Sequence, residues 1–413
     1  MEVAIVGGGI AGLSLALNLH QRGISCHVYE RATEITELGV GITLLPHAMR
    51  EFAALGLQEE IVAAGIENLE SCFFNRFGQL IYKEARGHHA NYRFPEIGIH
   101  RGRLHLILYR AALSQMGPQR ILTSRQCVGV EQDEGEVRVL LKETATGQSL
   151  PPVRADVAIA CDGINSAIRK QFYPREELAF AGINTWRGVT VRKPILTGRS
   201  YLRIGSINTG KLVVYPIIDN ADGQGNQMIN WMAEIQGRGD VTRNDWNKEG
   251  DLNDVLAIYG DWHFQWLDVA EMLRQASFVL EYPMVDRDPV SRWTFGRVTL
   301  AGDAAHPMYP RGSNGAAQAA IDARTLAEML ARYDGDPVRA LHAYEEQRRD
   351  VTARIVSTNR SNPPDFINIK VEQLVGDRPF DNLDRYISQD ELRALSDQYK
   401  RIAGFGLDDI GAR

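Results

Sequence analysis

The sequence predicts an α/β protein. We expect a discontinuous, Rossmann-like nucleotide-binding domain, a second domain built mainly on an antiparallel β-sheet, and C-terminal helices. Three observations predict this fold. Residues 2–30 have the pattern of a strand, a Gly-rich turn, a helix and a second strand. Residues 185–282 contain short β-branched and aromatic runs separated by Gly, Asn and Asp, which is typical of antiparallel strands. After Pro289 the first pattern returns, so an early and a late segment share one domain.

The predicted boundaries follow these changes of pattern. The nucleotide-binding domain takes residues 1–72, 97–180 and 284–360. The second domain, expected to bind the substrate, takes a hairpin at 73–96 and the strands of 181–283. Residues 361–413 form a polar tail with weak helical signals, which could cover the active site, bind a second subunit or pack on the surface.

Individual elements are predicted from apolar periodicity. In the first domain we expect strands at Val3–Val6, Cys26–Tyr29, Val157–Ala160 and Val298–Ala301, paired strands within Ile121–Leu141, and helices at Leu44–Gly56, Arg103–Gln115 and 316–333. Cys72–Tyr92 is the predicted hairpin. In the second domain we expect strands at Tyr201–Ile204, Leu212–Ile217 and Met228–Ile235, and a charged helix follows at 337–360.

Composition excludes several classes of protein. The chain has 413 residues, of which 44% are hydrophobic, and a net charge of −6 without a concentrated basic run, so neither nucleic acid nor an anionic membrane is an expected partner. The four cysteines are far apart and none lies in a metal-binding pattern. No signal peptide or long apolar run is present, and we expect a cytoplasmic protein, monomeric or homodimeric.

The first Gly-rich motif is Gly7–Gly12, which matches G-x-G-x-x-G where the first strand meets the first helix. Glycines there permit a tight turn and close approach of a pyrophosphate, which then lies at the helix N-terminus. Glu30 ends the second strand, where a carboxylate accepts hydrogen bonds from a ribose and disfavours a 2′-phosphate. The motif therefore indicates FAD or NAD, and a chance glycine cluster is the alternative.

The second Gly-rich motif follows the late strand Val298–Ala301. It delivers Asp303 to a turn, where a carboxylate can bind a polyol hydroxyl, and then Arg311–Gly315 opens a helix. The free N–H groups of that helix end suit developing negative charge, as on N1 of a reduced flavin. Two anion-type loops in one domain favour FAD over NAD, whereas the plain alternative is a strand, a loop and a capped helix.

These residues carry a resemblance to a known family. From Met1 to about Arg360, the chain resembles the class A flavoprotein monooxygenases, the relatives of salicylate and 4-hydroxybenzoate hydroxylases. The resemblance rests on Gly7–Gly12, on the Asp-Gly motif within Cys161–Arg169 and on Gly302-Asp303. Within the family, Asn230-Trp231, Tyr282–Pro289 and Met308–Pro310 are similar to the phenazine-modifying members, a likeness of scaffold and not necessarily of substrate.

The resemblance implies roles for individual residues. Glu30 would bind the adenosine ribose, Arg101 the phosphate or ribityl region and Asp303 the ribityl chain, while Cys127 would place backbone atoms near the adenine. Asp162 and Arg169 would serve FAD packing and the approach of the reductant, since the family has no separate nicotinamide domain. Surface or interdomain salt bridging is the alternative for Arg169. The full expected FAD set is Gly7, Gly9, Ala11, Gly12, Glu30, Arg31, Val40, Gly41, Arg101, Cys127, Asp162, Asp303, Pro310, Gly312, Asn314, Gly315 and Ala316.

The implied chemistry is reduction of FAD by NADH or NADPH, formation of a C4a-hydroperoxyflavin from O₂, and hydroxylation of an aromatic or N-heteroaromatic substrate, possibly with decarboxylation. No metal is expected. The carbonyl at Pro310 would face the reacting edge of the flavin, and Tyr215 is the candidate for a side chain facing it from the second domain. His306 is expected to be structural or flavin-side rather than a base.

Substrate recognition is assigned to two groups of residues. Arg311 departs from the apolar residue of phenazine-modifying members and could bind a substrate carboxylate; a salt bridge to a nearby acid is the competing interpretation. An aromatic wall suits a flat ligand, although its members could be ordinary core: Trp186, Tyr201, Tyr215, Trp231 and Met284. Rival functions on the same scaffold are an FAD-dependent oxidase or dehydrogenase, a Baeyer–Villiger oxygenase, and a non-enzymatic flavin-bound module.

Overall fold

The nucleotide-binding domain is built on a six-stranded sheet with the order β21-β22-β12-β1-β2-β8. In the computed structural model, which describes residues 1–37, 39–237 and 248–412, only the edge strand β21 of this sheet is antiparallel. The central strand β1 is almost completely buried, because a parallel sheet is covered on both faces. The strands are β21 (Thr294–Phe295), β22 (Val298–Leu300), β12 (Val157–Ala160), β1 (Glu2–Val6), β2 (Ser25–Tyr29) and β8 (Ile121–Leu122).

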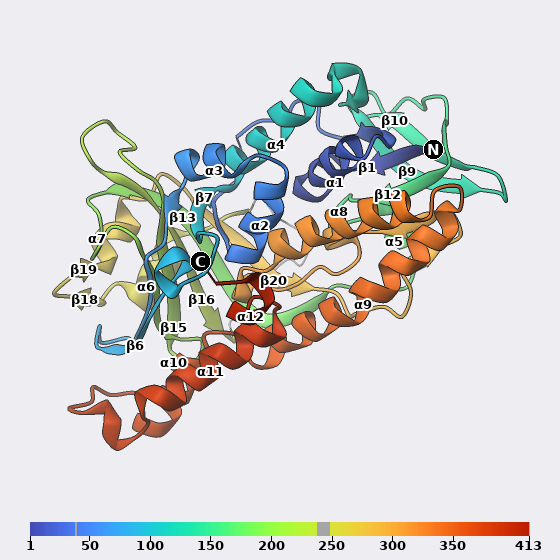
Figure 1. Ribbon diagram of the computed structural model, residues 1–413. Coiled ribbons are helices and arrows are strands. Elements are labelled where there is room, and N and C mark those ends of the chain that lie inside the picture. Colours follow the sequence, from blue (N-terminus) through green and yellow to red (C-terminus); the bar gives the residue numbers. More distant parts are fainter. Residues whose placement is uncertain (38, 238–247, 413) are drawn as a thin grey trace.

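Helices from both ends of the chain cover this sheet. Helix α1, which follows the first Gly-rich motif, packs against α8, which follows the second (Figure 1). The long helix α9 then packs along α8. The helices of this domain are α1 (Ile10–Gln21), α2 (Pro46–Ala54), α3 (Gln58–Ala64), α4 (Arg101–Met116), α5 (Ala167–Phe172), α8 (Gly315–Arg332) and α9 (Pro337–Ser361), with a short 3₁₀ turn at η2 (Pro118–Arg120); the 3₁₀ turn η1 (Gly87–Ala90) belongs to the hairpin segment of the second domain.

Two small antiparallel sheets complete the domain. One has the order β11-β10-β9 and the other the order β3-β7-β4. Their strands are β9 (Arg125–Gln132), β10 (Val137–Glu143), β11 (Val153–Ala155), β3 (Gly41–Leu44), β7 (Ile97–His100) and β4 (Ile66–Glu67).

The second domain is an eight-stranded sheet with the order β17-β20-β13-β16-β15-β14-β5-β6. All its pairs are antiparallel except β14 with β5, where the early hairpin joins the later strands. This is the mainly antiparallel sheet that the sequence predicts, and the hairpin joins it as expected. Strands β13 and β20 extend a few residues beyond the predicted limits at 181 and 283. The strands are β5 (Glu70–Phe74), β6 (Leu80–Ala85), β13 (Ala179–Arg192), β14 (Ser200–Ser206), β15 (Gly210–Ile218), β16 (Gln227–Gln236), β17 (Lys248–Glu249) and β20 (Val279–Asp286).

The two faces of the large sheet have different partners. One face packs Leu202, Leu212 and Trp231 against the segment with α6 (Leu252–Tyr259), β18 (His263–Phe264), β19 (Leu267–Asp268) and α7 (Val269–Arg274). The opposite face carries Tyr201 and Tyr215, and β15 packs there against β7 of the first domain. Side chains two residues apart on a strand share a face. Along β14 and β15, alternate side chains therefore point to the core with α6 and α7, and the others point to the face of the candidate site.

The tail is helical and lies across the same sheet, beneath it in Figure 1. Helix α10 contacts β5 and β14, and its Ile367 and Val371 share a core with Phe73 and Tyr82. The elements are α10 (Phe366–Val375), η5 (Leu383–Arg385), α11 (Gln389–Ile402) and α12 (Leu407–Ile410). The sequence predicts only weak helical signals here, yet Ser388 and Glu391 form a capping box at the start of α11.

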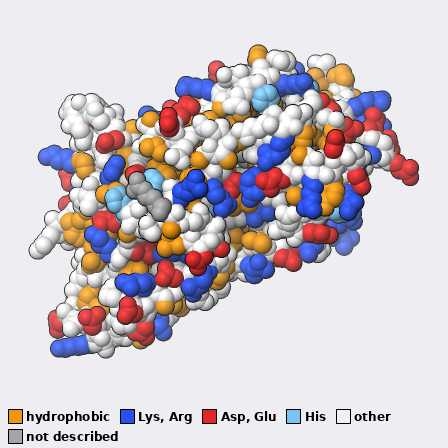
Figure 2. Space-filling model, viewed as in Figure 1, with side chains coloured by type: hydrophobic (Ala, Val, Ile, Leu, Met, Phe, Trp, Pro, Cys, Tyr) orange, Lys and Arg blue, Asp and Glu red, His pale blue; other side chains and the backbone are white. Residues whose placement is uncertain are grey.

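The surface agrees with the absence of a basic run in the sequence. On the face shown in Figure 2, Lys and Arg are interspersed with Asp and Glu. All four cysteines are buried and free. No helix among the described residues is long and apolar enough to span a membrane.

Candidate active site

The tertiary structure brings the three Gly-containing motifs together at the carboxyl ends of neighbouring parallel strands. A Cβ on Gly7 would lie 2.4 Å from the carbonyl oxygen of Cys161, and one on Gly302 would lie 2.9 Å from the Cβ of Ala11. Within the first motif, a Cβ on Gly12 would lie 1.9 Å from the oxygen of Gly7, so that turn excludes a side chain. Ligands of open α/β sheets bind at this edge.

The open space around these motifs suits a dinucleotide. Among the described residues, no atom outside the chain neighbours and the local helix backbone lies within 4 Å of the Cβ position of Gly9, Gly163 or Gly315, so backbone N–H groups can be approached closely. Glu30 accepts hydrogen bonds from the N–H of Gly8 (2.6 Å) and from the N–H of Ala32 (2.7 Å), which hold its carboxylate beside the turn.

Several charged and polar atoms along this space lack partners among the described residues. Oδ2 of Asp162 accepts a hydrogen bond from the N–H of Ala167 (2.9 Å), whereas its Oδ1 is buried without one. Asp303, in the 3₁₀ turn η3 (Gly302–Ala304), is exposed although protein surrounds it, and desolvation raises the pKa of its carboxyl. Arg101 is exposed at the start of α4, and in the described part of the chain neither it nor Asp303 makes an ion pair. Partnerless donors and acceptors beside open glycines fit a bound FAD.

Other expected FAD residues line or support the same region. Val40 accepts a backbone hydrogen bond from Arg101 (3.0 Å), and the N–H of Gly41 donates to Oδ1 of Asn230 (2.8 Å), which ties this loop to the second domain. Cys127 is buried in β9, close enough to Asp162 for that carboxylate to raise its thiol pKa further. Arg31 is exposed next to Glu30.

Helix α8 begins at Gly315, one residue earlier than predicted, and its N-terminus is held by side chains from three segments. Asn314 donates to the carbonyl of Gly312 (3.1 Å) and to the hydroxyl of Tyr399 (2.9 Å). Its Oδ1 lies 3.0 Å from Nε2 of His47, whose pKa burial lowers to about 3. His47 is therefore neutral. The Asn314 side chain is engaged by these partners and does not cap the helix. The N–H groups at the start of α8, including that of Ala316, can therefore face a ligand.

The loop before this helix contains the exposed Pro310, in the 3₁₀ turn η4 (Pro310–Gly312), and Arg311. Arg311 forms a salt bridge to a nearby acid, which is the competing interpretation of this residue. Its guanidinium donates to Asp365 of the tail (2.8 Å), and Lys211 pairs with the same carboxylate (3.1 Å) and with Glu234 (2.7 Å). Two cations and two anions thus form one buried group. The charge of Arg311 is therefore neutralised by an acid of its own chain, while its buried Nε makes no hydrogen bond within the described residues.

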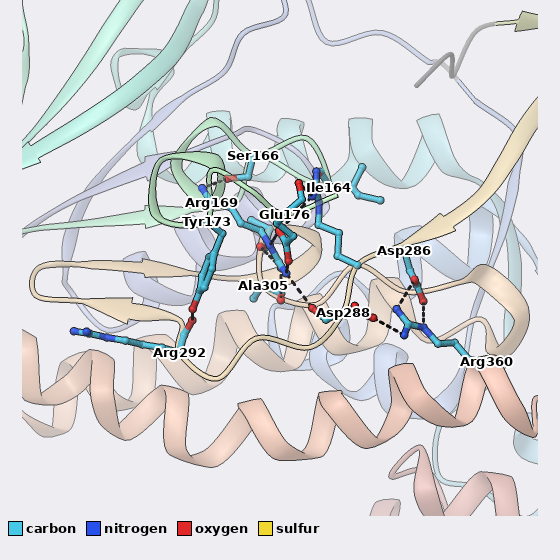
Figure 3. A network of polar contacts seen from close by, with 12 residues as sticks. Ile164, Ser166, Arg169, Tyr173, Glu176, Asp286, Asp288, Arg292, Ala305 and Arg360 are labelled. Atoms are coloured by element: carbon cyan, nitrogen blue, oxygen red, sulfur yellow. Dashed lines mark hydrogen bonds and ion pairs between the residues drawn. The ribbon is translucent and has the colours of Figure 1, made fainter. Parts of the chain in front are cut away.

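Arg169 is likewise a structural arginine, but it is buried and its partners lie within the nucleotide-binding domain, so its ion pair is neither at the surface nor between domains (Figure 3). Its Nε donates to Glu176 (2.7 Å), and its Nη1 donates to the carbonyls of Ala304 (2.9 Å) and Ala305 (2.7 Å), with the side chain 2% exposed. Those carbonyls follow Asp303, so Arg169 fixes the turn that presents Asp303. Arg348 similarly joins Asp322 (2.8 Å), which also contacts His306 (2.6 Å), in agreement with a structural role for His306.

The predicted aromatic wall divides between the two faces of the sheet. Trp186 and Trp231 belong to the core beside α6 and α7, which is the ordinary core role considered as the alternative. Met284 packs in a separate cluster with Tyr309. Tyr201 and Tyr215 lie on the other face and stack at 4.8 Å between ring centroids. Burial raises the pKa of the Tyr215 phenol well above its usual value, so this side chain stays protonated.

A cavity lies between this face and the flavin-side loop. Gly312 and Ser313 line it from that loop, and Tyr201 lines it from β14. Its charged lining residues are Glu84, Arg86, Glu96, Arg203 and Lys400, and the tail contributes Pro364, Ser396, Tyr399, Lys400 and Phe405. The tail therefore lines this cavity in addition to packing on the large sheet.

The sequence reasoning missed His47, Arg203 and Tyr399. None lies in a motif, and the strand of Arg203 was noticed only for its aromatic residues. The alternation along β14 was the available signal, because it places Arg203 on the face of Tyr201. No group of three or more His, Cys, Asp or Glu suited to a metal ion occurs among the residues described.

Comparisons with known proteins agree with this geometry. A family model described as an FAD binding domain matches residues 1–359. A phenazine 1,6-dicarboxylic acid hydroxylase of Lysobacter antibioticus is 40% identical over 87% of this chain and 89% of its own, and a 3-hydroxybenzoate 6-hydroxylase of Polaromonas naphthalenivorans is 31% identical over 91% of this chain and 90% of its own. The fold matches that of Klebsiella pneumoniae HpxO complexed with FAD and uric acid, with a TM-score of 0.75 at 22% identity, covering 99% of this chain and 96% of that one. The chain belongs to the FAD-binding domain family and is a class A FAD-dependent aromatic monooxygenase.

Proposed function

We propose that this monooxygenase hydroxylates an acidic aromatic or N-heteroaromatic ring, with NADH or NADPH as reductant. The observation that carries the proposal is the cavity beside Gly312 and Ser313, which combines aromatic side chains with an excess of cationic ones. Such a lining suits a flat ring that bears a negative charge. The printed names of the two relatives also describe acidic ring substrates, a phenazine dicarboxylic acid and a hydroxybenzoate.

Bound FAD supplies the electron transfer and the activation of oxygen. The chain supplies binding and orientation. Glu30, Arg101 and Asp303 would hold the ribose, phosphate and ribityl groups, and the N-terminus of α8 would stabilise negative charge on the flavin ring. Pro310 is the residue proposed to face the reacting edge.

On the substrate side, protonated Tyr215 would donate a hydrogen bond rather than remove a proton. The tail would exclude water, because five of its residues line the cavity. Hydroxylation at the carbon that carries the acid group would release it as CO₂, whereas hydroxylation elsewhere would keep it.

A substrate screen under ¹⁸O₂ tests the proposal. The FAD-loaded protein is mixed with NADH or NADPH and with aromatic acids, phenols and N-heterocycles, while NAD(P)H oxidation and ¹⁸O in the product are measured. We expect acidic rings to accelerate oxidation and one ¹⁸O atom to enter the ring. A ring-expanded ester or lactone would indicate Baeyer–Villiger chemistry, an oxidised product without ¹⁸O a dehydrogenase or oxidase, and no stimulation by any compound would contradict an enzymatic role on these ring classes.

A further inference from the structure

Asp365 joins the tail to the flavin-side loop, residues 309–313. Its Oδ2 accepts a hydrogen bond from Nη2 of Arg311 (2.8 Å), and the two side chains are 2% and 7% exposed. Within the part of the chain that the structure describes, no other acid lies in ion-pair distance of Arg311. Asp365 is at the N-cap of α10, yet its carboxylate makes no capping hydrogen bond there and pairs with Arg311 and Lys211 instead. Its carboxylate is therefore used to connect segments rather than to begin a helix.

The large sheet gives Asp365 a fixed anchor. Lys211 of β15 lies 3.1 Å from the same Oδ2 and 2.7 Å from Glu234 of β16. Lys211 and Glu234 face each other across the two strands, and the hydroxyl of Tyr259 lies within hydrogen-bond distance of both backbone carbonyls (3.0 and 2.8 Å). Burial alone would raise the pKa of Asp365, but Lys211 and Arg311 lower it well below its usual value, so the carboxylate is ionised. The ion pairs thus run from the sheet, through the tail, to the loop.

The other side-chain contacts to this loop are neutral. Asn359 donates to the carbonyl of Tyr309 (3.3 Å) and accepts a hydrogen bond from the hydroxyl of Tyr399 (2.8 Å). A Cβ on Gly312 would overlap that hydroxyl, so the tail lies directly against the loop. A charge-assisted hydrogen bond is about twice as strong as a neutral one. Asp365 therefore provides the strongest of these ties between the tail and the loop.

We propose that Asp365 is a positioning residue of the flavin site, which holds Arg311 and thereby fixes the loop against FAD. The inference rests on the role proposed above for this loop. Pro310 and Gly312 flank Arg311 in the chain, so a shift of the Arg311 backbone moves both of them. Because one ion pair links the tail to the loop, docking of the tail and binding of FAD should favour each other to the same extent.

Equilibrium binding of FAD to the FAD-free full-length chain tests the proposal without any ring substrate. In Asp365→Asn an amide no longer balances the buried charge of Arg311, so we expect the Kd of FAD to rise by about tenfold. Asp365→Glu keeps a carboxylate and should rescue most of this loss, with a Kd within about threefold of the wild type. Asp377→Asn is the matched control, because this tail acid pairs with Arg76 of the hairpin (2.9 Å) and not with the loop. We expect it to leave the Kd unchanged.

A charge-balanced variant separates positioning from the cost of a buried unpaired charge. Arg311→Met/Asp365→Asn removes both charges, so it should fold even if Asp365→Asn does not, and its thermal unfolding is measured beside that of the wild type. We expect it to bind FAD about tenfold more weakly as well. Hydrogen exchange gives a second measurement: FAD should slow exchange in α10 of the wild type and of Asp377→Asn, but not in the double variant.

A wild-type Kd of FAD in the double variant would overturn the proposal, as would equal losses in Asp365→Asn and Asp365→Glu or in Asp365→Asn and Asp377→Asn. Either result would leave the proposed class of ring substrate untouched, because no substrate is present in these measurements. Conversely, a substrate screen in which no ring is hydroxylated would not change the result for FAD binding.

Discussion

Two buried arginines mark the difference between the flavin side and the substrate side of this molecule. Around Arg169, every nitrogen of the guanidinium is bonded, to Glu176 and to the carbonyls of Ala304, Ala305 and Asp288. Among the described residues, Arg203 donates to one hydroxyl and lies over two aromatic rings. A saturated arginine holds its own chain in place, whereas an unsaturated one at a cavity has donors left for a ligand.

Arg311 shows that position in the sequence and partners in the fold can point to different roles. Arg311 lies beside the flavin-side glycines, and this position made it a candidate for substrate binding. In the folded chain, Asp365 of the tail forms an ion pair with it and neutralises its charge. Proximity to a motif thus says less about ligand binding than the list of partners that the folded chain already provides.

The largest effect expected from this comparison is on stability. Arg169→Met should lower the free energy of unfolding by about 3 kcal/mol, because it removes this donor from the buried carbonyls of Ala304 and Ala305 and leaves Glu176 with Arg287 as its remaining cation. Arg203→Met should lower it by no more than about 1 kcal/mol, since removal of an unpaired buried charge offsets the lost ring contacts. Urea denaturation of both FAD-free variants measures this. Equal losses would remove the distinction between the two arginines.

An intermediate effect is expected from pH at the flavin-side helix. The pKa of His47 is lowered from an ordinary value near 6.5 to about 3, so the unfolded chain binds the proton more readily than the folded one. The stabilisation is complete above about pH 6.5 and is lost as pH falls toward 3, by up to about 1.4 kcal/mol per pH unit. His47→Gln should flatten the pH dependence of unfolding between pH 6.5 and 5 by roughly that slope. Identical slopes in the two proteins would contradict the assignment.

The smallest effect concerns the tail that closes the cavity. Ser388→Ala removes the capping box of α11 and should cost about 1 kcal/mol. Without its cap the helix should open more often, so we also expect faster hydrogen exchange in α11. This helix carries the cavity residues Tyr399 and Lys400. Ser357→Ala, at an exposed position within α9, is the control and should change stability by less than about 0.5 kcal/mol. Equal hydrogen exchange in Ser388→Ala and the wild type would show that the cap does not stabilise the helix that lines the cavity.

Much of the flavin side could be predicted because its information is local. The strand Val3–Val6, the turn Gly7–Gly12 and Glu30 lie within thirty residues, and glycine is required where a Cβ would meet the backbone at 1.9 Å. The late strand and the helix near Ala316 were recognised for the same reason, with an error of one residue at the start of α8. Short-range sterics and buried apolar runs leave a readable pattern.

What only the tertiary structure decided is which charged groups meet. The sequence by itself determined the parallel domain, the antiparallel domain and FAD as the cofactor. It did not show that Asp365 would neutralise Arg311, that the tail would lie over β5 and β14, or that Arg203 would have no ion-pair partner in the described part of the chain. Pairs separated by dozens to hundreds of residues leave no periodic signal, because an ion pair depends on where two side chains arrive in space and not on their spacing along the chain.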